Sequence, residues 1–274
     1  YFTEEHVRTL SLLAPQIASS VENARLYEEL AQREQRMEQD LKAARRVQSI
    51  LLPREPEIEG LEVAVGWRPA REVSGDLYDF FEHGEDEAVI AFGDSSGKGA
   101  AAALYGALVS GLLRTLAPRI RKPAALMKRL NQVLLERRVD AQYVTLLLMY
   151  WNRKNLTLTI SNAGALTPLI CRGGERLRVL AEGIPLGLLD DREYDEITFQ
   201  TQPDDLILLY SDGVQDQTNA TEGEYGTHRP FRILKKNCNK TVKEVADAVM
   251  ADVDKHRGDV MLTDDQTLIV IRVR

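Results

Sequence analysis

Residues 87–104 read EAVIAFGDSSGKGAAAAL, and this stretch decides how the rest of the chain is interpreted. The apolar run at its start has the length and composition of a buried strand that ends at Asp94. A glycine-rich turn follows, and segment 100–116 is then apolar for about four turns, which predicts a buried helix. The turn could hold a phosphate through its backbone amides or a metal ion through its aspartate.

The turn does not have the spacing of a nucleotide-binding loop. Such a loop needs a glycine, four residues, and then Gly-Lys-Ser/Thr. Here only three residues separate Gly93 from Gly97. Lys98 is followed by Gly99, so no hydroxyl group follows the lysine to hold Mg²⁺. Asp94 would also place a carboxylate where the phosphates bind, so the sequence favours a metal site.

Composition limits the class of protein. The 274 residues are 44% hydrophobic, enough for one sizeable core and a smaller appendage. The net charge of -7 disfavours binding to nucleic acid or to an anionic membrane surface, and no apolar run is expected to span a bilayer. Cys171 and Cys238 lie far apart, which argues against disulfides or structural zinc and favours a reducing, cytoplasmic location. The chain begins at Tyr1 without a signal-peptide pattern, so we expect a fragment of a longer protein.

The first part of the chain predicts one long helix over residues 3–52. Apolar residues recur there at three- and four-residue spacing, and no proline lies between Pro15 and Pro53. Its middle, EELAQREQRMEQDLKAARR (28–46), is dense in Glu, Gln, Arg and Lys. This pattern favours a coiled-coil linker over 31–55 and a homodimer formed through it. The alternative is a single amphipathic helix lying on its own domain.

From residue 56 onward the pattern changes to short strands and separate helices. The predicted strands are 61–67, 76–81, 87–94, 143–151, 156–162, 167–173, 204–212 and 266–274. Helices are predicted at 100–116, 123–138 and 242–256. Several strands follow one another without a helix between them, which favours the α+β class over alternating α/β.

Aspartates stand at the ends of several apolar strands. Asp94 ends VIAFGD, Asp212 ends LILLYSD, and Asp264 and Asp265 precede QTLIVI. Taken singly, each is an ordinary turn residue. Gathered together, carboxylates repel one another and resist ionisation unless a cation neutralises them. With few histidines and no thiolates nearby, such a cluster favours Mg²⁺ or Mn²⁺, and two such ions about 4 Å apart form a hydrolytic site.

A set of motifs carries a family resemblance. VSGDLYDFF, FGDSSGKGAAAAL, YVTLLLMYW, NAGALTP, GIPLGL, DDLILLYSDGV and DDQTLIVIRV occur in the order found in bacterial PPM-type serine phosphatases. Segment 56–274 resembles the SpoIIE/RsbU branch of this protein phosphatase 2C superfamily. Segment 1–30 is similar to the closing helix of a GAF sensor domain, and AARRVQSILLP (43–53) to the junction that precedes the phosphatase domain. The resemblance implies an antiparallel β-sandwich flanked by helices, with the metal site in a cleft at one edge.

The resemblance also assigns residues to the metals. It implies that Asp76 binds one ion, that Asp94 bridges two ions, and that Ser95 offers its backbone carbonyl. Asp212 matches a ligand of the other ion. Asp264 is the assigned last ligand, while Asp265 occupies the neighbouring position where relatives carry a second Asp or Asn, so both remain candidates. The catalytic set expected from this pattern is Asp76, Asp94, Asp212 and Asp264.

Two positions depart from the family pattern. Ala165 in NAGALTP stands where the family has a histidine, and Gln215 stands where Glu is common. Neither is an assigned ligand, so the metal site is expected to persist. Two further residues, Lys98 and Asp79, each have two alternative roles. Lys98 could steer a phosphate or stay in solvent, and Asp79 could orient a metal-bound water or cap a turn.

The resemblance implies a metal-dependent hydrolase of phosphoserine or phosphothreonine on a protein, without a phosphoenzyme. The implied substrate is a phosphorylated STAS-domain anti-anti-sigma factor. One alternative is a non-catalytic docking module controlled by its N-terminal helix. Another is a two-metal hydrolase of small phosphoesters.

Overall fold

The computed structural model describes residues 3–53 and 56–274. The chain divides into two compact units, residues 1–45 and 46–274. Helix α1 (Glu4–Leu51) confirms the long helix predicted over 3–52. Residues 1, 2, 54 and 55 lie outside the described residues, and so does the predicted end of the linker at residue 55. The sensor-helix and coiled-coil assignments of the first unit stay predictions.

In the first unit, α1 leaves its apolar side chains exposed. Leu13, Ile17, Val21 and Met37 all lie in solvent on this helix. Ion pairs between residues four apart, Arg25 with Glu29 and Lys42 with Glu38, occupy other positions along it. Such pairs stabilise a helix by only a few tenths of a kcal/mol each. The helix therefore exposes apolar surface that a coiled-coil partner could cover.

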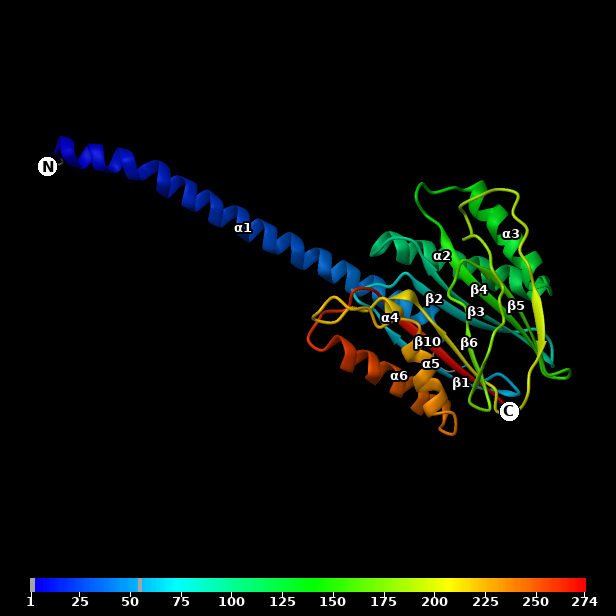
Figure 1. Cartoon of the computed structure of the whole chain (residues 1–274). Helices are drawn as coiled ribbons and strands as arrows, with labels where there is room; N and C mark the ends of the chain where they lie inside the picture. The colour runs from blue at the N-terminus through cyan, green and yellow to red at the C-terminus, as the bar shows by residue number, and fades with distance from the viewer. Residues whose placement is uncertain (1–2, 54–55) are drawn as a thin grey trace. The chain divides into compact units, whose positions relative to one another are not determined.

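The second unit is built on two antiparallel five-stranded sheets, which confirms the predicted sandwich (Figure 1). The first sheet has the order β1-β10-β9-β6-β7, with bounds β1 (Leu61–Arg68), β6 (Leu169–Arg172), β7 (Glu175–Leu177), β9 (Leu206–Tyr210) and β10 (Gln266–Val273). The second sheet has the order β2-β3-β4-β5-β8, with bounds β2 (Asp76–Glu82), β3 (Glu87–Ser95), β4 (Val144–Asn152), β5 (Thr157–Ala163) and β8 (Ile197–Gln200).

The continuous apolar runs arise because both faces of each sheet are buried. On β3, Ile90 and Phe92 face the core between the sheets, while Val89 and Ala91 face the helices. The inter-sheet core joins side chains from the two sheets, such as Met149 and Ile269. Successive residues of a strand point to opposite faces, so a strand covered on both sides has no polar alternation.

Helices cover the outer face of each sheet, as Figure 1 shows. The second sheet carries α2 (Ala100–Leu116) and α3 (Pro123–Glu136), with the short helix η1 (Ala117–Arg119) between them. The first sheet carries α5 (His228–Lys236) and α6 (Val242–Arg257), and α4 (Asp212–Gln215) follows β9 directly. A capping box of Thr241 and Glu244 begins α6.

Helix α2 departs from two sequence predictions. Segment Ala100–Arg119 is long and apolar enough to cross a membrane by length and composition, so the expectation that no run has this length is wrong. The helix packs Val109 and Leu113 into the core beneath it, which accounts for much of its apolar character. The expected burial is only partial, since Leu104 and Leu108 are exposed on its other face.

Strands β7 and β8 and helix α5 are among the short elements that were not predicted from the sequence. Strands β7 and β8 have three and four residues, too short for a clear alternation of apolar and polar side chains. Helix α5 has only nine residues, contains Pro230, and is largely basic. It therefore has too few apolar residues to show a helical spacing. None of these elements contains a predicted metal ligand.

Candidate metal centre

Asp76 and Asp94 are brought together by strand pairing. Asp76 begins β2 and Asp94 lies near the end of β3, and the two are direct Cα partners in the antiparallel ladder. Asp76 is buried, and its Oδ2 accepts a hydrogen bond from the Thr267 hydroxyl on β10. Burial first, and then the charge of Asp94, raise the pKa of Asp76 well above its usual range.

The pKa of Asp94 is raised by burial and by the neighbouring acidic side chains. Burial raises the pKa of its carboxyl to about 7, and the charges of Asp212, Asp264 and Asp265 add to the shift. These three residues come from the other sheet and its connections. The sandwich therefore brings the predicted strand ends to one place, as the sequence implied.

Asp212 reaches the group from the end of β9. It is the first residue of α4, directly after Ser211. The Ser211 hydroxyl donates to the Asp265 carbonyl oxygen (3.1 Å) and accepts from the Thr267 amide (3.0 Å), which ties the end of β9 to the start of β10. Desolvation by the surrounding protein and then the charge of Asp264 raise the pKa of Asp212, although this residue is exposed.

Asp264 and Asp265 have different partners. Asp264 Oδ2 pairs with Lys98 Nζ at 2.6 Å, and the same ammonium group donates to the Thr263 carbonyl oxygen at 3.0 Å. Lys98 lies between Gly97 (φ +88°) and Gly99 (φ +75°), and this left-handed backbone is one that glycine readily adopts. Lys98 therefore has a definite partner among the candidate ligands.

Asp265 holds the segment that leads into Asp76. Its Oδ1 accepts from the Ala70 amide (2.7 Å), and its Oδ2 accepts from the Gly75 amide (2.9 Å). Both carboxylate oxygens are thus engaged with backbone. The oxygens of Asp264 have partners as well, since Oδ1 accepts from the Asp265 amide (2.9 Å) and Oδ2 pairs with Lys98.

Close packing at the centre requires glycine at position 75. A Cβ atom there would lie 2.9 Å from Asp94 Oδ1 and 3.0 Å from the Ser95 carbonyl oxygen. Ser95 itself is buried, and its hydroxyl has no hydrogen-bond partner among the described residues. The carbonyl that the resemblance assigns to a metal therefore lies beside Asp94, next to the chain of Gly75.

A pocket of about 270 Å³ opens over this group. Its lining includes Asp94, Asp212, Asp264, Lys98 and Ala165. The loop with Ala165 is closed by Asn162, whose side-chain amide bonds to the Ala165 backbone in both directions (2.8 and 2.9 Å). The position where the family has a histidine therefore faces the same pocket as three candidate ligands.

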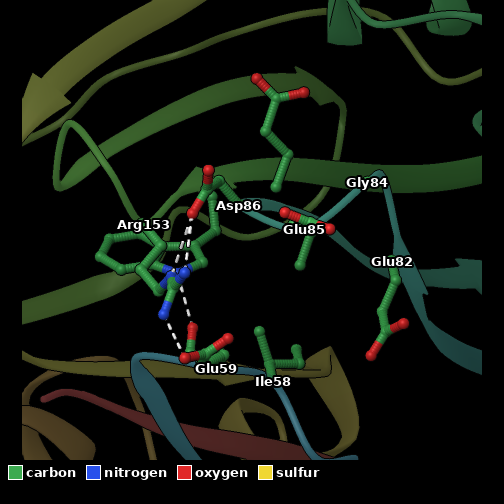
Figure 2. A pocket seen from close by; sticks show the side chains of 10 residues that line it. Ile58, Glu59, Glu82, Gly84, Glu85, Asp86 and Arg153 are labelled. Atoms are coloured by element: carbon green, nitrogen blue, oxygen red, sulfur yellow. Dashed lines mark hydrogen bonds and ion pairs between the residues drawn. The ribbon is translucent and has the colours of Figure 1, made fainter.

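A larger hollow of about 430 Å³ lies elsewhere, and none of the predicted ligands lines it (Figure 2). It is acidic, with Glu82 and Glu85 on its wall. Figure 2 shows Arg153 between Glu59 and Asp86, to both of which it is ion-paired. We assign no chemistry to this hollow, since acidic side chains alone do not define a site.

The donor set of the smaller pocket fits hard divalent cations. Oxygen ligands suit Mg²⁺ and Mn²⁺, and raised carboxyl pKa values indicate negative charge that the protein itself does not compensate. Within residues 3–53 and 56–274, however, no three acidic, histidine or cysteine side chains are placed to bind one ion together. Asp264 is bonded to Lys98 and Asp76 is bonded to Thr267. These bonds direct carboxylate oxygens toward protein partners and away from a shared metal position.

Comparison with known proteins decides the family. The model of the family described as Stage II sporulation protein E (SpoIIE) matches residues 84–274. The chain belongs to the SpoIIE family. The resemblance read from the motifs is thereby confirmed for the phosphatase domain, and the assignments of the region before it stay predictions.

Two curated relatives of the SpoIIE family come from Bacillus subtilis. Stage II sporulation protein E is 27% identical over 202 residues, which cover 73% of this chain and 24% of that protein. Phosphoserine phosphatase RsbU is 28% identical over 245 residues, which cover 87% of this chain and 71% of that protein. The chain therefore spans about a quarter of the first relative and about seven tenths of the second.

Solved structures show that this SpoIIE-family chain has the PP2C phosphatase fold. The SiaA-PP2C domain of Pseudomonas aeruginosa has a TM-score of 0.78 at 22% identity, covering 88% of this chain and 98% of that chain. RsbX, solved in complex with magnesium, has a TM-score of 0.62 at 17% identity, covering 80% and 98%. At these identities the likeness concerns the fold.

Proposed function

We propose that this chain is a metal-dependent protein serine/threonine phosphatase. The observation that carries the proposal is that Asp94, Asp212 and Asp264, which come from both sheets, line one pocket, with Asp76 directly opposite Asp94 on the neighbouring strand. The carboxyl pKa values of Asp76, Asp94 and Asp212 are raised. A cluster of this kind is costly for the fold without a cation, which supports a functional reason for it. The family supports the same activity, because RsbU is named a phosphoserine phosphatase.

Asp76, Asp94, Asp212 and Asp264 would hold the divalent ions. When bound, Mn²⁺ or Mg²⁺ supplies Lewis-acid charge that activates water and offsets the negative charge of a phosphoryl group. The magnesium complex of RsbX supports this class of ion. Asp265 would help to position Asp76 and would not bind a metal ion itself. Its carboxylate accepts hydrogen bonds from the Ala70 and Gly75 amides and so holds the segment before Asp76.

The residues around the pocket favour direct hydrolysis. None of its described lining residues is a cysteine or a histidine, two side chains that can form a covalent phosphoryl intermediate. Lys98 is the one basic side chain in that lining, and its ammonium group can attract a phosphate monoester. We assign Lys98 to substrate attraction once its bond to Asp264 is released.

The proposed substrate is phosphoserine on a small STAS-domain anti-anti-sigma factor. The charged wall of the pocket, with Lys98 among three aspartates, fits a phosphate, and apolar side chains such as Phe92 and Leu166 fit neighbouring residues of a protein loop. The test compares turnover of a phosphoserine STAS-domain protein with turnover of p-nitrophenyl phosphate at equal Mn²⁺. Much higher kcat/KM on the protein supports the proposal, and equal or higher kcat/KM on the small ester favours a general phosphoesterase.

One observation favours a second candidate, a docking module that has kept the fold without the chemistry. Asp264 is paired with Lys98, and no three described acidic side chains converge on one point. A calorimetric Mn²⁺ titration separates the two candidates. Binding that is lost in Asp94→Asn supports the phosphatase, whereas absence of binding supports the docking module.

The predicted dimer would place regulation in the N-terminal helix. A parallel coiled coil over 31–55 would join two chains and carry a signal toward the phosphatase domain. Replacing Leu41 and Leu51 by Asp places charges in the predicted seam. Sedimentation should then show monomers where the native chain forms dimers, and an unchanged dimer would refute this interface.

A further inference from the structure

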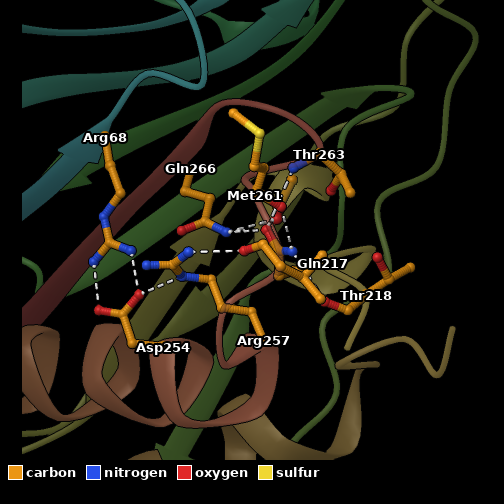
Figure 3. Close-up of polar contacts among 10 residues, drawn as sticks. Arg68, Gln217, Thr218, Asp254, Arg257, Met261, Thr263 and Gln266 are labelled. Carbon is orange, nitrogen blue, oxygen red and sulfur yellow. Dashed lines mark hydrogen bonds and ion pairs between the residues drawn. The ribbon is translucent and has the colours of Figure 1, made fainter. Parts of the chain in front are cut away.

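Gln217 lies at the centre of a buried polar network (Figure 3). Its side chain is fully buried in the segment that follows α4. The Nε2 atom donates to the carbonyl oxygens of Thr218 (3.0 Å) and Met261 (3.2 Å). The Oε1 atom accepts from Gln266 Nε2 (3.0 Å) and from the Thr263 amide (3.4 Å). A single side chain thus reaches the segment after Asp212 and the segment before Asp264.

Gln266 extends the network to the other candidate ligand. Its Nε2 atom also donates to the Gly213 carbonyl oxygen at 3.2 Å, and Gly213 follows Asp212 directly. The backbones are closely packed here, because a Cβ atom at Gly213 would lie 2.0 Å from the Asp265 carbonyl oxygen. The two glutamine amides therefore connect the backbone beside Asp212 with the backbone beside Asp264.

The segment that leads to Asp264 begins after α6, and other residues hold that end in place. Arg257 at the end of α6 donates to the Val260 carbonyl oxygen (2.8 Å) and to Asp254 Oδ1 (2.9 Å). Arg68 of β1 holds the same Asp254 with both guanidinium nitrogens (2.6 and 3.0 Å). Figure 3 shows Arg257 beside Asp254 and Gln217 near Met261 and Thr263. Release of Gln217 would thus loosen the end of the segment that carries Asp264, where Lys98 stays bonded to the Thr263 carbonyl oxygen.

We propose that Gln217 is a positioning residue that sets the separation between Asp212 and Asp264, and thereby the affinity of the site for divalent cations. The inference rests on the proposed metal-dependent function. Gln217 bonds to neither carboxylate and acts through Met261, Thr263 and Gln266. Partners that orient metal ligands from outside typically change metal affinity by 10–100-fold when they are replaced.

The experiment measures Mn²⁺ affinity by calorimetry for the native chain and for Gln217→Met, which keeps the length of the side chain and removes its hydrogen bonds. The matched control is Asn131→Leu. Asn131 is another buried amide, bonded to the Gly187 amide and the Leu189 carbonyl oxygen, and none of these residues lines the pocket. Urea denaturation records the stability of each variant.

Gln217→Met is expected to weaken Mn²⁺ binding by about tenfold or more. Asn131→Leu should lose stability while its Mn²⁺ affinity stays native. Native affinity in folded Gln217→Met would overturn the inference and leave the proposed function standing. If Gln217→Met does not fold, Gln217→Asn, which keeps the amide but shortens its reach, replaces it with the same criterion. A native chain that binds no Mn²⁺ would refute the proposed function, and this inference with it.

Discussion

Asp76 and Asp94 stand directly opposite each other across the antiparallel pair β2–β3. Like charges in this arrangement destabilise a strand pair. Burial and mutual repulsion raise the carboxyl pKa of Asp76, and the pKa of Asp94 rises to about 7. The centre of the domain therefore carries a charge arrangement that weakens the fold and that a divalent cation would relieve.

Replacing Asp94 by Asn should stabilise the protein in a chelating buffer at pH 8. The substitution removes a buried charge with three acidic neighbours, and we expect a gain on the order of 1–3 kcal/mol, seen as a rise in Tm of several degrees. At pH 5 the gain should shrink, because Asp94 is then protonated in the folded state. A lower Tm for Asp94→Asn at pH 8 would contradict this account.

Asp79 should make stability depend on pH. It is buried, pairs with Arg114 Nη2 at 2.8 Å and accepts from Ser110, yet desolvation still raises its pKa to about 6. Between about pH 4 and pH 6 the folded state keeps a proton that the unfolded state releases. Stability from this group is therefore present at low pH and lost as pH rises to about 6, by up to about 3 kcal/mol.

Urea denaturation of the native chain and of Asp79→Asn at pH 4.5 and pH 7 measures this effect. The comparison with the variant isolates Asp79 from Asp76, Asp94 and Asp212, whose raised pKa values act in the same direction. The native chain should lose more stability between the two pH values than the variant does. Equal losses would show that Asp79 titrates normally.

Gly75→Ala should weaken both the fold and metal binding. The added Cβ would lie 2.9 Å from Asp94 Oδ1 and 3.0 Å from the Ser95 carbonyl oxygen, so β3 or Asp94 must move. Overpacking of this kind costs about 1–3 kcal/mol. Gly111→Ala on α2 is the control, since its Cβ meets nothing within 4 Å, and it should stabilise the helix by about 1 kcal/mol. Denaturation and Mn²⁺ calorimetry on both variants would test the difference, and native affinity in Gly75→Ala would refute the role of close packing.

Lys98→Gln should tighten Mn²⁺ binding. The Lys98 ammonium and a divalent cation compete for Asp264 Oδ2, so removal of the ammonium frees that oxygen. The pair is half exposed, and such pairs contribute about 0.2–1 kcal/mol, which corresponds to an affinity change of about fivefold at most. Lys98→Arg keeps the positive charge and should stay near native affinity. Weaker binding by Lys98→Gln would mean that Lys98 supports the metal site and does not compete with it.

The sequence was sufficient to predict the strand ends that carry Asp94, Asp212 and Asp264, because a strand buried on both faces has a continuous apolar run. Asp76 was expected at the start of strand 76–81, and its role as a metal ligand came from the family resemblance. The pairing of Asp76 with Asp94 could not be predicted, because the sequence alone does not determine which residues of two strands lie opposite each other. The bond of Lys98 to Thr263 likewise joins positions 165 residues apart, and no local pattern reports it.

The roles of Asp265 and Gln217 were also beyond sequence reasoning. Asp265 was assigned by its place beside Asp264, yet its oxygens hold the amides of Ala70 and Gly75. No sequence pattern singles out Gln217, whereas its complete burial marks it as a structural link. Both roles depend on long-range backbone partners, which side-chain type and spacing do not specify.

The central claim is that the aspartates around Asp94 form a cation site that hydrolyses phosphoserine. The most direct measurement is phosphate release from a phosphoserine STAS-domain protein, with Mn²⁺ and with a chelator, by the native chain and by Asp94→Asn. The account predicts release that requires Mn²⁺ and is lost in Asp94→Asn. Release that persists in the chelator, or that Asp94→Asn retains, would contradict it.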